Sequence, residues 1–283
     1  MPHSDPRTLV STDWLAKHQH SPDIRIIDAT WFLPTEDRDP KAEYNACHIP
    51  NARFFDIDEI SDAKSDLPHM APPAEKFISR MRAMGIGDGH QVVVYDAVGI
   101  MSAARVWWLF HLMGKTDTAV LDGGLPKWIA EGREVEDMPP ILRDRHMTAQ
   151  RNAQLVKSVT QVAAAAKLKD AQILDARSSA RFKGEAPEPR AGLRSGHIPN
   201  SKNLPFPMLI NGDGTLKSNA KLAEIMENAK IDMNAPIITT CGSGVTAAII
   251  NLALERLGHK HHAVYDGSWA EWGMYNDLKI ELG

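Results

Sequence analysis

Cysteine, aromatic residues and long apolar runs are all scarce in this chain. Its 283 residues include two cysteines, Cys47 and Cys241, and 6% aromatic residues. So few cysteines exclude a disulfide-rich scaffold and favour a reducing compartment. No apolar run approaches the length of a membrane span, and the N-terminal residues lack the charged-then-apolar pattern of a signal peptide. We therefore expect a cytoplasmic protein without a membrane partner.

An excess of positive charge is also lacking. The formal net charge is −4, so a nucleic acid is not an expected partner. No cysteine and histidine residues have the spacing of a metal site. The hydrophobic content of 43% and the charged content of 24% are typical of a soluble globular protein. A chain of this length can form one large domain or two ordinary ones.

Three short motifs occur twice, in the same order, and they indicate an internal repeat. The spacing between the copies is nearly constant and is far longer than the period of a solenoid. The chain is therefore predicted to hold two copies of one domain. The motifs begin at His48 and His197, 149 residues apart, at Ile26 and Ile173, 147 apart, and at Leu121 and Tyr265, 144 apart.

Each copy alternates short apolar runs with longer helical patterns. This alternation predicts an α/β fold in which a parallel sheet is covered by helices on both faces. Strands are expected at 24–29, 91–95 and 118–121, and again at 172–176, 237–240 and 262–265; helices are expected at 73–84 and 103–113, and again at 219–229 and 245–257.

A proline pair at Pro139 and Pro140 interrupts helix and strand alike and marks the end of the first copy. We expect one domain over residues 1–138, a connecting segment over 139–157 and a second domain over 158–283.

Cys241 is the strongest candidate for a nucleophile. It lies between a predicted buried strand and a predicted helix, where unpaired backbone N–H groups and the helix dipole favour an anion. These groups favour the thiolate, the reactive form of cysteine. Gly242 and Gly244 allow the loop to curl around the sulfur atom. The matched position in the first copy is Asp96, so only the second copy is expected to be catalytic.

The loop from Cys241 to Thr246, the duplicated His-Ile-Pro segments and the non-catalytic first copy resemble the tandem rhodanese family of sulfurtransferases. The resemblance implies two tandem rhodanese-like domains. Family members that use thiosulfate typically carry basic residues in this loop, whereas this loop is similar to that of members whose donor is 3-mercaptopyruvate. The implied reaction releases pyruvate and moves sulfur through a cysteine persulfide to cyanide or to a thiol acceptor such as thioredoxin, without a cofactor.

The same resemblance implies roles for individual residues. Arg181 and Arg190 match the substrate-binding stretch of the family, and a guanidinium suits a carboxylate because it offers two parallel donors. Ser243, His69 and Asp58 match a proton relay. The remaining loop positions are expected to contact the donor; they are Gly242, Gly244, Val245 and Thr246.

Other polar residues are expected to be structural or exposed. His48 and His197 belong to the repeated motif, so both are expected to support the fold. Cys47 has no glycine-rich loop after it and is expected to be structural. Lys183 and Arg194 match no family motif and are expected at the surface.

Three alternatives remain open at this point. Transfer of sulfur from thiosulfate to cyanide is the nearest, although the uncharged loop argues against it as the main activity. A cysteine phosphatase would need an arginine closing the loop, and the sixth residue after the cysteine is Ala247. A non-catalytic binding module is the third alternative, and the presence of Cys241 argues against it.

Overall fold

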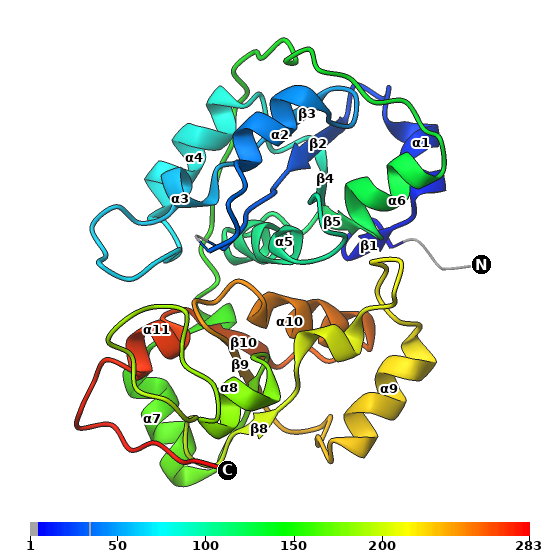
Figure 1. Ribbon diagram of the computed structural model, residues 1–283. Helices are drawn as coiled ribbons and strands as arrows, with labels where there is room; N and C mark the ends of the chain where they lie inside the picture. Colours follow the sequence, from blue (N-terminus) through cyan, green and yellow to red (C-terminus); the bar gives the residue numbers. More distant parts are fainter. Residues whose placement is uncertain (1–4, 34) are drawn as a thin grey trace. The chain divides into compact units, whose positions relative to one another are not determined.

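The computed structural model describes residues 5–33 and 35–283 (Figure 1). The first four residues, on which the expectation about a signal peptide partly rests, lie outside this range. The chain forms two compact units. Unit 1 comprises Met1–Ala63, Ala71–Asn152 and Asn211–Leu216, and unit 2 comprises Lys64–Met70, Ala153–Ile210 and Lys217–Gly283. Two short segments therefore belong to a different unit from the residues that flank them. The expected domain boundaries stay a prediction.

Unit 1 contains a sheet of five parallel strands in the order β1-β5-β4-β2-β3. Its central strands are rich in isoleucine and valine, because a parallel sheet covered on both faces needs apolar side chains in both directions. The strands are β1 (Leu9–Val10), β2 (Ile24–Asp28), β3 (Ala52–Phe54), β4 (Gln91–Tyr95) and β5 (Thr118–Leu121).

Helices cover both faces of this sheet (Figure 1). On one face, Leu15, Tyr44 and Trp128 from α1, α2 and α6 pack against the sheet. On the other face, α5 contacts β4 and β5, and Phe110 of α5 meets Phe77 of α4 with ring centroids 5.1 Å apart. The helices are α1 (Thr12–His18), α2 (Pro40–Ala46), α3 (Ile57–Ile60), α4 (Ala74–Ala83), α5 (Ser102–Leu112) and α6 (Gly124–Ala130).

Unit 2 repeats this plan, with five parallel strands in the order β6-β10-β9-β7-β8. Val162 of α7 and Trp272 of α11 pack on one face, and α10 contacts β9 and β10. The strands are β6 (Val156–Lys157), β7 (Gln172–Asp175), β8 (Lys202–Asn203), β9 (Ile237–Thr240) and β10 (His262–Tyr265); the helices are α7 (Val159–Leu168), α8 (Ser179–Lys183), α9 (Asn219–Asn228), α10 (Ala247–Arg256) and α11 (Ser268–Trp272), with 3₁₀ turns at Ala153–Leu155 and Phe206–Leu209.

The strand register confirms the predicted alignment of Asp96 with Cys241. The strand before each of these residues pairs its last residue with the final aspartate of the neighbouring strand. That aspartate is Asp28 in unit 1 and Asp175 in unit 2. The fold class is therefore as predicted: two α/β domains of one plan.

The repeated histidines have the structural roles expected of them. His48 Nδ1 lies 2.7 Å from the carbonyl oxygen of Tyr44, and its ring stacks on Tyr44 at 4.2 Å. His197 Nδ1 lies 2.8 Å from the carbonyl oxygen of Phe182, and its ring stacks on Phe182 at 3.8 Å. Each histidine thus fixes the end of a helix to the loop that leads into the next strand.

No helix in the described part of the chain is long and apolar enough to cross a membrane.

Candidate active site

Cys241 lies directly after β9, at the carboxyl end of the sheet in unit 2, with its side chain buried. The predicted helix begins two residues later than expected, at Ala247 rather than at Val245. Gly244 explains the difference, because its φ of +79° is a left-handed conformation that cannot continue into a right-handed helix. The loop therefore turns back on itself before α10 starts, and Val245 and Thr246 form its last turn.

The segment after β10 holds the backbone of this loop in place. The Cys241 amide donates to Ser268 Oγ at 3.2 Å, and that hydroxyl donates to the carbonyl of Tyr265 at 2.8 Å. The amide of Trp269 donates in turn to the Cys241 carbonyl at 3.0 Å, and the amide of Ala270 to the Gly242 carbonyl at 2.8 Å. These bonds fix the position from which the thiol projects.

Arg181 places a positive charge beside the loop. A Cβ atom added to Gly242 would lie 3.0 Å from Arg181 Nη2, so the guanidinium packs where any side chain would stand. The side chain of Arg181 is 24% exposed, which leaves it open to a small ligand. The absence of a side chain at Gly242 therefore leaves room for the cation.

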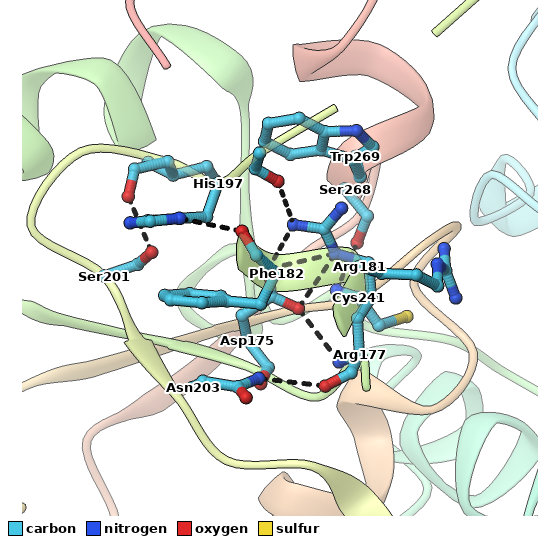
Figure 2. A network of polar contacts seen from close by, with 12 residues as sticks. Asp175, Arg177, Arg181, Phe182, His197, Ser201, Asn203, Cys241, Ser268 and Trp269 are labelled. Carbon is cyan, nitrogen blue, oxygen red and sulfur yellow. Dashed lines mark hydrogen bonds and ion pairs between the residues drawn. The ribbon is translucent and has the colours of Figure 1, made fainter. Parts of the chain in front are cut away.

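Arg177 forms the centre of a buried ionic network, drawn together with Cys241 in Figure 2. Its guanidinium forks onto Asp175 at 2.6 and 3.0 Å, donates to Glu188 at 2.8 Å and lies 4.2 Å over the ring of Trp269. Burial lowers the pKa of Arg177, but the two carboxylates outweigh burial and hold the pKa above its ordinary value. Breaking one partner of such a network leaves a buried charge uncompensated.

His69 and Arg190 lie together in unit 2, because the segment Lys64–Met70 belongs to that unit. Arg190 Nη2 is 3.2 Å from His69 Nε2. Arginine has no acceptor atom, so Arg190 donates, and this ring nitrogen accepts. The geometry therefore fits a neutral imidazole that carries its proton on Nδ1.

The model of the Rhodanese-like domain family matches residues 11–131 and 158–275, one match in each repeat.

The chain belongs to the rhodanese-like family.

Two relatives and one solved structure illustrate the similarity over nearly the full chain. The chain is 44% identical to thiosulfate/3-mercaptopyruvate sulfurtransferase 1, mitochondrial, of Arabidopsis thaliana, with 96% of this chain and 78% of the relative covered. It is 42% identical to 3-mercaptopyruvate sulfurtransferase of Escherichia coli strain K12, over 96% and 97% of the two chains. A crystal structure of SseA, a 3-mercaptopyruvate sulfotransferase of Escherichia coli, matches with a TM-score of 0.85 and 40% identity over 93% of this chain and 99% of that chain.

Of the predicted site residues, the structure places Arg181 and Ser243 at the loop. Arg181 contacts Gly242, and Arg190 contacts His69. Ser243 is buried in the loop. Asp58 lies in unit 1, where its Oδ2 accepts a hydrogen bond from Trp31 Nε1 at 3.1 Å. The relay formed by Ser243, His69 and Asp58 stays a prediction.

Cys47 has the properties of a structural thiol in the first rhodanese-like domain. It caps the C-terminus of α2, where its amide donates to the carbonyl of Glu43. Burial, and then the nearby carboxylate of Asp28, raise the pKa of the Cys47 thiol. A raised pKa disfavours the thiolate, so this cysteine is a poor nucleophile at neutral pH.

The expectation that Arg194 is a surface residue is wrong. Its partly buried guanidinium donates to the carbonyls of Leu278 at 3.0 Å and Trp272 at 3.2 Å. Arg194 thus fixes the C-terminal segment to the second domain, a role that no local sequence pattern reveals. Lys183 is exposed, as expected.

Sequence reasoning missed the residues that hold the site together. Arg177 and Glu188 are scattered charges in the sequence, and nothing in their spacing shows that they are buried together. Ser268 could have been found, because it belongs to the repeated motif that begins at Tyr265, and the first copy has Gly124 at that position.

Among residues 5–33 and 35–283, no group of three or more histidine, cysteine, aspartate or glutamate side chains could hold a metal ion.

Proposed function

We propose that this protein is a sulfurtransferase that takes sulfur from 3-mercaptopyruvate and carries it as a persulfide on Cys241. The observation that supports this most directly is the guanidinium of Arg181 against Gly242, next to the thiol, in a loop without a charged side chain of its own. A fixed cation beside a thiol suits a small donor with one carboxylate. The names of the relatives favour the same donor.

The first half of the reaction breaks the carbon–sulfur bond of the donor. The Cys241 thiolate attacks the donor sulfur, the new sulfur–sulfur bond forms, and the bonding electrons leave with the carbon as the enolate of pyruvate. Protonation of that enolate gives pyruvate. Backbone N–H groups of the loop and the N-terminus of α10 then favour the negative charge of the persulfide.

The second half of the reaction returns Cys241 to its starting state. An acceptor thiolate, or cyanide, attacks the outer sulfur, and the electrons of the sulfur–sulfur bond return to Cys241 as the thiolate. Two successive displacements at one residue need no cofactor.

Arg181 and Arg190 are the proposed ligands of the donor carboxylate. Arg181→Ala and Arg190→Ala should each lower kcat/KM for 3-mercaptopyruvate. The loss of transition-state stabilisation should be about 1.5–3 kcal/mol, the range for a hydrogen bond to a charged group. Lys183→Ala is the matched control, because Lys183 is an exposed cation at the end of the same helix as Arg181. Unchanged kinetics in both arginine variants would reject their role.

The proposed proton source is a relay of Ser243, His69 and Asp58. A neutral histidine can donate from Nδ1 and accept at Nε2, so it can pass a proton between two partners near neutral pH. Arg190 donates to His69 Nε2 at 3.2 Å in the structure, so this nitrogen can accept a proton from the relay once Arg190 turns to the donor carboxylate.

One kinetic comparison tests the function as a whole. We expect kcat/KM for 3-mercaptopyruvate to exceed that for thiosulfate, with cyanide as the acceptor in both assays. Mass spectrometry after treatment with the donor should show one added sulfur on the peptide that contains Cys241. A preference for thiosulfate would instead support the alternative activity, transfer of sulfur from thiosulfate to cyanide.

We also propose a thiol acceptor such as thioredoxin and a cytoplasmic location. Both cysteines, Cys47 and Cys241, are free thiols, which suits a reducing compartment. Turnover with reduced thioredoxin, compared with turnover with a small thiol at equal concentration, tests the acceptor. Fractionation of cells tests the location.

A further inference from the structure

Glu188 lies between two arginines of unit 2 and touches both. Its Oε1 accepts from Arg177 Nη1 at 2.8 Å and from Arg181 Nε at 3.2 Å, and its Oε2 accepts from Arg181 Nη2 at 2.5 Å. The carboxylate side chain is only 2% exposed. A buried carboxylate held at both oxygens cannot rotate without breaking an ion pair, so its position is fixed.

The position of Glu188 is set by the core of the domain. Its partner Arg177 is 1% exposed and is forked onto Asp175, the last residue of β7. Arg177 also donates to the carbonyl of Gly196 at 2.9 Å. The chain of alternating charges therefore runs from the sheet, through Arg177 and Glu188, to Arg181.

Glu188 uses one particular edge of the Arg181 guanidinium. It binds the side-on edge, which consists of Nε and Nη2. A guanidinium has a second, end-on edge, made of Nη1 and the other hydrogen of Nη2. Nη2 is also the atom that packs against Gly242, beside Cys241. The edge left for a donor is therefore the one next to the nucleophile.

We propose that Glu188 is a positioning residue that determines donor specificity. It holds Arg181 so that the end-on edge is presented beside Cys241, and its negative charge offsets one of the positive charges there. The site then suits a donor with a single carboxylate better than a dianion such as thiosulfate. This inference rests on the proposed function.

Glu188→Gln tests the proposal, because glutamine keeps the size and one acceptor oxygen but removes the charge. The repulsion between Glu188 and a bound donor is twice as large for a dianion as for a monoanion. Removing the charge of Glu188 therefore strengthens the binding of a dianion more than that of a monoanion. We therefore expect the ratio of kcat/KM for thiosulfate to kcat/KM for 3-mercaptopyruvate to rise roughly fivefold to tenfold. The change should be mainly in KM, because Glu188 does not touch the reacting atoms.

Glu185→Gln is the matched control. Glu185 is an exposed glutamate three positions earlier in the same segment. Its replacement by glutamine therefore removes the same charge at a place where solvent screens it. The ratio should stay at its wild-type value in this variant. An equal shift in both glutamine variants, or an equal loss for both donors in Glu188→Gln, would overturn the proposal.

Glu188→Asp separates the effect of the negative charge at this position from the effect of the length of the side chain. Aspartate keeps the negative charge but is one carbon shorter, so it should raise KM for both donors and leave their ratio unchanged. Should Glu188→Gln fail to fold, this variant decides, and an unaltered KM for 3-mercaptopyruvate would overturn the proposal. A wild-type protein that does not use 3-mercaptopyruvate would instead reject the proposed function itself.

Discussion

The two units carry different side chains at the same position, directly after the central strand. In unit 1 the residue after the central strand is Asp96, which is fully buried and accepts N–H bonds from Val98, Met101 and Ala103 at 3.0, 2.7 and 2.9 Å. In unit 2 the matched residue is Cys241. The loop and the start of the following helix therefore form an anion cradle that unit 1 fills with its own carboxylate. In unit 2 the loop carries a buried thiol at the matched position.

The neighbouring positions differ in a consistent way. Unit 2 has Arg177 and Trp269 where the repeat places Thr30 and Leu125 in unit 1. In unit 1 this place is a cavity of about 250 Å³, lined by Thr30, Leu125 and Tyr44 among others. In unit 2 the corresponding place is filled by a stacked guanidinium and indole. Unit 2 thus uses buried charge to position a cation, whereas unit 1 has Thr30 and Leu125 at the two matched positions.

Cys241→Ser gives the largest expected effect, because it removes the proposed nucleophile, which unit 1 lacks at the matched position. Sulfur transfer should be abolished while the fold is kept, since a serine hydroxyl is a much weaker nucleophile than a thiolate at neutral pH. Circular dichroism and steady-state assays check both parts. Cys47→Ser is the control and should retain full activity. Persisting transfer in Cys241→Ser would contradict the mechanism.

His69→Ala tests the role of the segment Lys64–Met70, which belongs to unit 2 although the residues on either side of it in the sequence belong to unit 1. Turnover should fall by a factor on the order of 10²–10⁴ if proton delivery limits the rate. His146→Ala, at an exposed histidine of unit 1, should have no effect. The two variants are compared by kcat with 3-mercaptopyruvate. Equal, near-wild-type turnover in both would show that His69 only supports the fold.

Most of the fold could be predicted from the sequence, because its main strands are continuous apolar runs. The expected ranges 91–95, 118–121, 237–240 and 262–265 coincide with β4, β5, β9 and β10. The edge strands β1, β3, β6 and β8 span only two or three residues. Runs this short have no periodicity to detect, so tertiary pairing alone defines them.

The site was predictable only in part, for a related reason. Cys241 stands out because glycines and a strand-to-helix change surround it in the sequence. Arg177 and Glu188 are 11 residues apart and carry no pattern of their own. Their burial depends on a fold that brings Asp175 and Trp269 to the same place, and a charge in sequence does not show which other charge it will meet.

Arg177→Met sharpens the comparison in terms of stability. The variant leaves Asp175 buried without its cation and removes one of the two arginines that bind Glu188, so unit 2 should lose about 3–5 kcal/mol of unfolding free energy. The matched change in unit 1 is Thr30→Ala, which removes the hydrogen bonds of the hydroxyl with the amide of Ala97 and the carboxylate of Asp28 and should cost about 1–2 kcal/mol. Urea unfolding followed by tryptophan fluorescence measures both. Similar, small losses in the two variants would show that the network contributes little to stability.

His90 gives the smallest expected effect, and it concerns unit 1 alone. Burial, and then the charges of Arg25 and other nearby cations, lower the pKa of His90 to about 4. The neutral ring accepts the amide of Gly87 at 2.9 Å through Nδ1. The matched position in unit 2 is Ala235, so unit 2 has no such group.

The sign of the His90 effect follows from the lowered pKa. The unfolded chain binds the proton near the ordinary pKa of 6.5, whereas the folded chain binds it only near pH 4. Stability from this group is therefore complete above pH 6.5 and is lost as the pH falls towards 4. His90→Asn keeps an acceptor for the amide of Gly87 but cannot bind a proton in this range. Between pH 6.5 and 4 its unfolding free energy should therefore fall by about 1 kcal/mol less than that of the wild type, after allowance for screening by solvent. His146→Asn is the control, and urea unfolding between pH 4 and 7 is the measurement. A wild-type slope in His90→Asn would show that other groups govern the acid sensitivity of unit 1.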